Sequence, residues 1–157
     1  AVVRSAHAVG VSVECELGAI SGVEDGISHK SVNLVDLHEV EQFIAMVDCD
    51  ALAVGIGNAH GMYQGTPHFD FDRLAACRAL GTPPLVLHGG SGTPDDMIRK
   101  AIQLGIRKIN VATELRMAFM SGLEATVGQR DFYAMYRQAK ANMYELARHK
   151  IQLFQGK

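Results

Sequence analysis

The sequence lacks tryptophan, long apolar runs and closely paired cysteines. Its three cysteines, Cys15, Cys49 and Cys77, are widely spaced and form no C-x-x-C pair. That spacing argues against a disulfide framework and favours a reducing, cytoplasmic setting. No apolar run is long enough to cross a bilayer, and the start carries no signal-peptide pattern. These absences argue against a disulfide-rich secreted domain and a membrane-spanning protein.

Charge is nearly balanced as well. The sequence holds 15 basic and 17 acidic residues, which are interspersed and give a formal net charge of −2. Neither a nucleic-acid surface nor a polybasic membrane patch is therefore expected. Of the 157 residues 48% are hydrophobic, enough for one domain with a sizeable core.

The first nine residues read as the last turns of a helix that Gly10 ends. They contain neither an initiator methionine nor a helix N-cap. We therefore expect the chain to be a fragment or a processed piece of a longer protein. The alternative is a natural protein of half length.

Strand and helix patterns alternate along the chain. Residues 11–17 alternate apolar and polar side chains, which predicts a strand with two different faces. Three short apolar runs predict buried strands at 51–56, 85–87 and 106–111. Helical patterns cover 36–47, 71–80, 93–104, a stretch from about 114, and 131–154. This alternation predicts a parallel sheet with right-handed crossovers, either an open doubly wound sheet or half of a (β/α)₈ barrel.

Local signals set some of the boundaries. Asp36, with Glu39 three residues later, resembles a capping box. Thr93 is expected to cap a helix whose first residue is Pro94. Residues 18–35 contain several glycines and predict a long connection, of a kind that is usually functional or disordered.

Polar side chains stand at the end of each predicted strand. In parallel α/β folds these carboxyl ends gather on one side, where active sites form. The side chains concerned are Glu14, Glu16, His60, His88, Ser91, Asn110 and Thr113. We expect them to share one site.

His60 and His88 are candidate zinc ligands, because neutral imidazole is a favoured donor to Zn²⁺. Two hydrogen-bonded histidines near loops are the simpler alternative. A catalytic zinc usually takes three protein ligands, so either Glu16 completes the set or the third ligand lies upstream. If the fold is a barrel, Glu14 and Glu16 point into its interior and need partners there, either the metal site or other polar groups.

Two further segments carry candidate chemistry. Residues 89–92 read Gly-Gly-Ser-Gly before a helix start, an arrangement that suits a phosphate but also occurs as a plain turn. Glu24, in the glycine-containing connection, is a candidate acid or base on a closing loop, or else a solvated charge. The three cysteines have no activating neighbours and are expected to be packing residues.

Taken together, the motifs resemble those of the class II, zinc-dependent fructose- and tagatose-bisphosphate aldolases. The resemblance rests on residues 13–24, 53–61, 69–74, 85–92 and 108–115. It implies a TIM (β/α)₈ barrel of which residues 1–157, as the carboxy-terminal half of a single domain, hold strands five to eight. It also implies two of three zinc ligands in His60 and His88, with Glu16 as an alternative ligand or behind them.

The resemblance implies roles for the remaining site residues. The dihydroxyacetone phosphate end of the substrate would be held by Gly61, Gly89, Ser91, Asn110 and Thr113. Asn110 would also contact the enediolate, and Glu24 would assist proton transfer. A monovalent cation, Na⁺ or K⁺, is expected nearby. Bound zinc would polarise the ketose carbonyl.

The expected function is zinc-dependent cleavage or condensation of a ketose 1,6-bisphosphate to dihydroxyacetone phosphate and glyceraldehyde 3-phosphate. The family's H-x-D-H segment is not among these residues, and Ala112 favours the tagatose branch. The alternative is a catalytically incomplete phosphosugar-binding or structural subunit; a phosphate-binding barrel isomerase fits the histidine pair less well. Expected protein partners are an amino-terminal half of the barrel and further copies, in a dimer or tetramer.

Overall fold

The computed structural model describes residues 1–24, 27–29, 34–63 and 65–156. Its strands are β1 (Glu14–Leu17), β2 (Gly22–Glu24), β3 (Ile27–His29), β4 (Ala51–Val54), β5 (Leu85–Leu87) and β6 (Ile106–Ile109). Its α-helices are α1 (Val2–His7), α2 (Leu37–Met46), α3 (Phe71–Ala79), α4 (Asp95–Gln103), α5 (Thr113–Glu124) and α6 (Phe132–Phe154). A short 3₁₀ helix, η1 (Val127–Gln129), separates the last two.

Four strands form one sheet in the order β1-β4-β5-β6, and every pair in it is parallel. The predicted parallel sheet is therefore confirmed. The register aligns Glu16, Ala53, Val86 and Lys108 in one row across the four strands. Because side chains alternate between faces along a strand, this row and the Leu52 row lie on opposite faces.

Helices cover the face that carries Leu52. That side chain joins Val54, Leu85, Leu87 and Ile106 in a buried core with the inward sides of α2, α3 and α4. Each helix contributes fully buried residues, such as Val40, Leu74 and Ile98. Apolar burial of this kind is worth about 25 cal/mol per Å² and fixes which face of the sheet is covered. The row with Glu16 is thereby left to the opposite face.

The predicted helix caps have different outcomes. Asp36 caps α2, with its carboxylate accepting from the backbone N–H groups of His38 and Glu39, so that prediction is confirmed. The prediction for Thr93 is wrong, because α4 begins at Asp95 and places Pro94 at its N-cap. Thr93 lies one residue too early, and its hydroxyl donates to the carbonyl of Gly89 instead, at 3.4 Å.

The connection after β1 differs from the expected long loop. It contains a two-stranded antiparallel hairpin of β2 and β3. Ser21 adds an isolated parallel bridge to Ala59, in the loop after β4. The hairpin strands are only three residues long, too short for a periodic signal in the sequence. The bridge brings the start of this hairpin beside the loop that carries His60.

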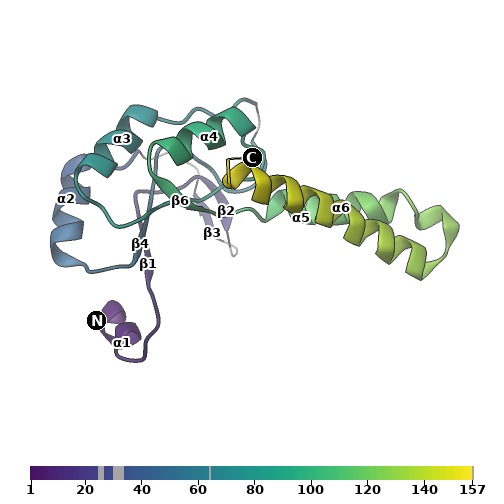
Figure 1. Ribbon diagram of the computed structural model, residues 1–157, viewed down its shortest axis with the longest axis horizontal. Coiled ribbons are helices and arrows are strands. Elements are labelled where there is room, and N and C mark those ends of the chain that lie inside the picture. Colours follow the sequence, from purple (N-terminus) through teal and green to yellow (C-terminus); the bar gives the residue numbers. More distant parts are fainter. Residues whose placement is uncertain (25–26, 30–33, 64, 157) are drawn as a thin grey trace.

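Helices α5 and α6 form a hairpin that projects from the sheet, and the last turns of α6 return to it (Figure 1). The two helices approach closely where Gly122 faces the backbone of Ala139. At the other end of the chain, α1 is tied to the start of β4 by a 2.8 Å hydrogen bond between His7 and Asp50.

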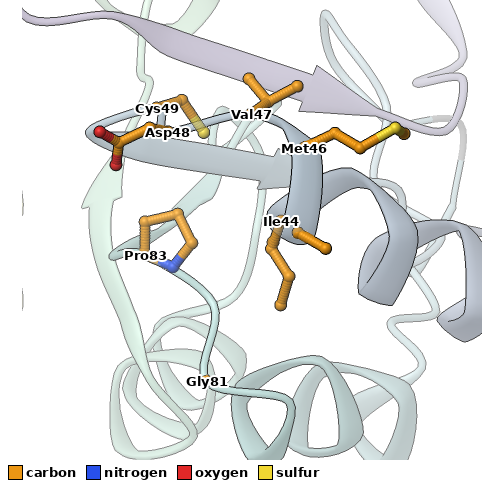
Figure 2. A pocket seen from close by; sticks show the side chains of 8 residues that line it. Ile44, Met46, Val47, Asp48, Cys49, Gly81 and Pro83 are labelled. Atoms are coloured by element: carbon orange, nitrogen blue, oxygen red, sulfur yellow. The ribbon is translucent and has the colours of Figure 1, made fainter.

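A cavity of about 390 Å³ lies between the segments that lead into β4 and β5 (Figure 2). Ile44, Met46, Cys49, Gly81 and Pro83 are among its lining residues. Because these residues precede the strands, the cavity is at the amino-terminal edge of the sheet.

Cys15, Cys49 and Cys77 are all free thiols. Burial raises the pKa of Cys49 to about 11, in keeping with its expected role in packing. None of the described helices combines the length and apolarity that a membrane span requires.

Candidate functional site

The carboxyl edge of the sheet brings a histidine from each of two neighbouring strands together. His60 follows β4 and His88 follows β5 directly, and their ring centroids are 5.7 Å apart. His88 is two residues after Val86, so it continues the face that carries the Glu16 row. The register thus places an imidazole beside the two carboxylates of β1.

The ring of His88 lies between those carboxylates. Its Nε2 is 2.9 Å from Oε1 of Glu14, and its Nδ1 is 2.9 Å from Oε2 of Glu16. Glu14 can only accept when ionised, so Nε2 carries the proton of this bond in the neutral ring. Nδ1 then presents a lone pair toward Glu16.

Within the described residues, Nδ1 of His88 is buried and makes no hydrogen bond, despite its short distance to Glu16. The lone pair of His88 Nδ1 and the negatively charged oxygen of Glu16 repel each other at this distance unless a positive charge lies with them. Ligand atoms of Glu16, His60 and His88 all lie within 4.8 Å of one another. Two imidazoles and a carboxylate are a donor set that suits Zn²⁺, so the residues fit the metal.

Lys108 extends this cluster toward β6. Its Nζ is 2.9 Å from Oε2 of Glu14 and donates to Oδ1 of Asn110 at 2.7 Å. Partial burial acts to raise the pKa of Glu14, but hydrogen bonds from Lys108 and His88 outweigh it and hold the pKa below its ordinary value. Lysine can only donate, so the amide of Asn110 turns its oxygen toward Lys108 and keeps its NH₂ group for another acceptor.

Two side chains tie the histidine loops to each other. The buried Asn58 accepts from the N–H of Ile56 and donates to the carbonyl of His88 at 2.9 Å. The hydroxyl of Tyr63 accepts from Ala59 and donates to Gly89, both at 3.0 Å. Burial raises the pKa of Tyr63, which keeps it protonated for that donation.

The loop at 89–92 is packed against its neighbours. A Cβ on Gly90 would meet Cγ2 of Ile109 at 2.6 Å and the carbonyl oxygen of Asn110 at 2.9 Å, so only glycine fits there. The nearly buried hydroxyl of Ser91 accepts from the N–H groups of Ala112 and Glu114, each at 3.3 Å. That hydroxyl keeps its own hydrogen to donate.

The remaining predicted residues surround this centre. Gly61 follows His60 with a φ of +91°, and Gly89 follows His88 with a φ of +68°, conformations that favour glycine. Thr113 is the first residue of α5, and its hydroxyl accepts from Arg116 at 3.4 Å. The backbone of Glu24 ends β2, but its side chain lies outside the described part of the chain.

Sequence reasoning did not single out Lys108, Tyr63 or Glu114. Lys108 had a usable signal, since it stands two residues before Asn110 and therefore shares its face in a strand. Tyr63 and Glu114 had none, because their partners lie on segments that only the fold brings close.

The fold and site together define a parallel α/β protein with a candidate metal group at the carboxyl edge of its sheet. The sequence profile described as fructose-bisphosphate aldolase class-II matches residues 1–157. The chain therefore belongs to the class II fructose-bisphosphate aldolase family, as the motif resemblance predicted. Its four parallel strands with their helices correspond to half of the family's TIM barrel.

Solved structures agree with this assignment. The chain is 37% identical to the YdjI aldolase from Escherichia coli K12, with a TM-score of 0.82 over 97% of this chain and 52% of that one. It is 20% identical to the fructose-bisphosphate aldolase from Campylobacter jejuni, with a TM-score of 0.75 over 98% of this chain and 54% of that one. The second likeness concerns the fold alone. The chain thus spans about half the length of the structures it matches.

Proposed function

We propose that the protein is a zinc-dependent lyase that cleaves a ketose 1,6-bisphosphate between C3 and C4. The products are dihydroxyacetone phosphate and glyceraldehyde 3-phosphate. The observation that carries the proposal is the meeting of Glu16, His60 and His88, with a buried imidazole nitrogen of His88 that lacks a hydrogen bond. Membership of the class II aldolase family supports it.

His60 and His88 hold the zinc ion in this proposal, and Glu16 either completes the set or stands behind the histidines. Zinc, when bound there, supplies a Lewis acid that polarises the ketose carbonyl. Glu14 keeps Nε2 of His88 protonated and thereby turns Nδ1 toward the ion. Such outer partners orient metal-bound histidines and raise their basicity as ligands.

Asn110 and Lys108 act on the charge that develops on the substrate oxygens as the C3–C4 bond breaks. Lys108 fixes the Asn110 amide by holding its oxygen, which leaves the NH₂ group to donate to the oxygen that gains charge. Lys108 adds a positive charge in the same place, already positioned before the substrate binds. Groups oriented in advance lower the barrier because they need no rearrangement during the reaction.

The phosphate of the dihydroxyacetone phosphate end binds at the loop of residues 89–92. Because the Ser91 hydroxyl accepts from the N–H groups of Ala112 and Glu114, its own hydrogen can be donated to the phosphate. We assign Gly61, Gly89 and Thr113 to the same end of the substrate from the family resemblance. Glu24 moves protons on the three-carbon product. Its place on the hairpin that bridges to Ala59 supports this role, since that bridge brings the hairpin beside the His60 loop.

The test combines metal analysis with cleavage assays on the protein at its natural length. Purified protein is expected to hold one zinc per site and to cleave fructose or tagatose 1,6-bisphosphate faster than a ketose 1-phosphate. His88→Ala should lose the zinc and at least about 10²-fold in kcat/KM, whereas His38→Ala, an exposed control on α2, should change neither. Full zinc occupancy in His88→Ala, or no cleavage of any ketose phosphate by the wild type, would overturn the proposal.

A second assay isolates Glu24. Glu24→Gln should slow proton exchange on dihydroxyacetone phosphate and leave the zinc content unchanged, because this residue acts on protons and not on the metal. Proton exchange at the wild-type rate in Glu24→Gln would show that Glu24 is a solvated loop charge with no role in proton transfer.

A further inference from the structure

A lysine is buried near the end of α6. Lys150 is 8% exposed and sits one turn before the core residue Leu153. A buried ammonium is strongly disfavoured unless an opposite charge and hydrogen bonds compensate for its lost hydration. The partner of Lys150 therefore indicates which other segment this part of α6 stabilises.

That partner is Glu114, the second residue of α5. Nζ of Lys150 lies 3.0 Å from Oε2 and donates to Oε1 at 3.4 Å. The Glu114 side chain is 16% exposed, so the pair is largely shielded from water. Shielding makes each charge dependent on the other.

The Glu114 end of this pair reaches the loop of residues 89–92. Oε1 of Glu114 accepts from the backbone N–H of Gly92 at 2.6 Å. In return, the hydroxyl of Ser91 accepts from the backbone N–H of Glu114. Each segment thus satisfies a backbone donor of the other, as in a capping box but between two segments far apart in sequence.

The residue before Lys150 holds the other flank of the loop. His149 lies 3.0 Å from Oδ2 of Asp95, the first residue of α4. Two successive residues of α6 therefore contact the first residues of α4 and α5, the two helices on either side of this loop.

We propose that Glu114, neutralised by Lys150, is a positioning residue that sets the phosphate-binding loop. Its carboxylate holds the Gly92 amide, and this contact directs the Ser91 hydroxyl and the neighbouring amides toward a phosphate monoester. Lys150 is needed because an uncompensated carboxylate at this loop would repel the phosphate. The inference rests on the proposed function, which takes this loop as the phosphate site.

Three variants separate charge from hydrogen bonding. Lys150→Met keeps the stem of the side chain but leaves the Glu114 charge uncompensated. Adding Glu114→Gln removes that charge and keeps an oxygen to accept from Gly92. Replacing both residues by methionine removes the acceptor as well, and apolar replacements of buried ion pairs are often tolerated by the fold. Lys140→Met, at an exposed position of the same helix, is the control.

The measurement is calorimetric titration of metal-stripped protein with inorganic phosphate, so that phosphate cannot ligate the ion. Lys150→Met and the double methionine variant should each bind phosphate about tenfold more weakly than wild type. Lys150→Met with Glu114→Gln should recover to within about threefold of wild type, and Lys140→Met should match it. If the Lys150–Glu114 pair had only a structural role, the variants would have lower melting temperatures but their phosphate affinities would not follow this order.

Cleavage assays provide the second readout. Lys150→Met should raise KM for the ketose bisphosphate with kcat within about threefold, because phosphate contacts are the same in ground and transition states. If phosphate binding follows the predicted order but no ketose bisphosphate is cleaved, the positioning role stands and the proposed reaction fails. If cleavage occurs but phosphate affinity and KM are equal in all variants, or if wild type binds no phosphate, the positioning role is wrong.

Discussion

Glu14 accepts a hydrogen bond from Nε2 of His88 at 2.9 Å, which in the neutral ring leaves Nδ1 as the nitrogen with a lone pair. Lys108 holds the same carboxylate from the other side, at 2.9 Å from Oε2. The carboxylate therefore stays ionised, with its pKa held below the ordinary value. A chain of three side chains from β1, the β5 loop and β6 thus orients one proposed ligand before any ion is bound.

Removing the carboxylate at position 14 should weaken metal binding without removing a ligand. Glu14→Ala is expected to raise the zinc dissociation constant by about 10–100-fold, the usual effect of losing an outer partner of a metal-bound histidine. Competition with a chromophoric chelator measures it. Glu41→Ala, an exposed position on α2, is the control and should leave the affinity unchanged. Equal affinities in both variants would show that Glu14 does not orient His88.

Asn110 should matter for the rate more than for binding. Its NH₂ group is left free to donate because Lys108 holds the amide oxygen at 2.7 Å. Asn110→Ala is therefore expected to lower kcat by about 10²–10³-fold with little change in KM, as for other donors to a developing oxyanion. Steady-state cleavage kinetics decide this. A rise in KM at unchanged kcat would instead make Asn110 a ground-state binding residue.

Much of this architecture could be predicted from the sequence, because its signals are local. Strand β5 was predicted at its observed bounds, and Asp36 was recognised as a cap from its spacing to Glu39. The candidate site was predictable for a topological reason, since residues after parallel strands reach the same edge. His60, His88 and Glu16 could therefore be assigned to one site before any interatomic distance was known, and their ligand atoms do lie close together.

What the sequence did not reveal depends on tertiary contacts. Nothing local links Lys150 to Glu114, which lie 36 residues apart on different helices. The hairpin of β2 and β3 was not predicted, because three-residue strands are too short to show an alternation of apolar and polar side chains. Thr93 looked like a cap by residue type, yet the helix starts one residue later than that role requires.

Asp70 provides a test of stability and of its pH dependence. Its carboxylate caps α3 by accepting from the N–H of Arg73 at 2.8 Å, and its own N–H closes the loop that carries His60 by bonding to Ile56. The Arg73 backbone N–H lowers the pKa of Asp70 most; burial opposes this, and the Arg73 side chain lowers the pKa further. Asp70→Ala should lower the free energy of unfolding by about 1 kcal/mol at pH 7.

The sign of the pH effect follows from the lowered pKa. The folded state releases the Asp70 proton more readily than the unfolded state, so its contribution is complete above about pH 5. It is lost as the pH falls below about 4, toward the folded-state pKa. Urea denaturation at pH 7, 5 and 3 measures the difference in free energy of unfolding between wild type and Asp70→Ala. This difference should become smaller only at pH 3. A larger difference in acid would contradict the assignment.

The seam between α5 and α6 is tested by two glycines. A methyl group on Gly122 would meet the backbone nitrogen of Ala139 at 2.6 Å, whereas one on Gly128 would meet nothing within 4 Å. Overpacking costs about 1–3 kcal/mol and exceeds the gain of about 1 kcal/mol for alanine in a helix. Gly122→Ala should therefore lower the free energy of unfolding and Gly128→Ala should change it by less than about 0.5 kcal/mol. Equal effects in chemical denaturation would show that the helices do not pack as described.

The most direct test of the account is the position of the metal in a crystal of the protein at its natural length. Diffraction data on either side of the zinc absorption edge locate the ion without reference to activity. The account predicts one anomalous peak about 2.0–2.1 Å from a nitrogen of both His60 and His88, on the side of Nδ1 for His88. A catalytically active crystal with zinc bound elsewhere, and with these two rings free of metal, would contradict it.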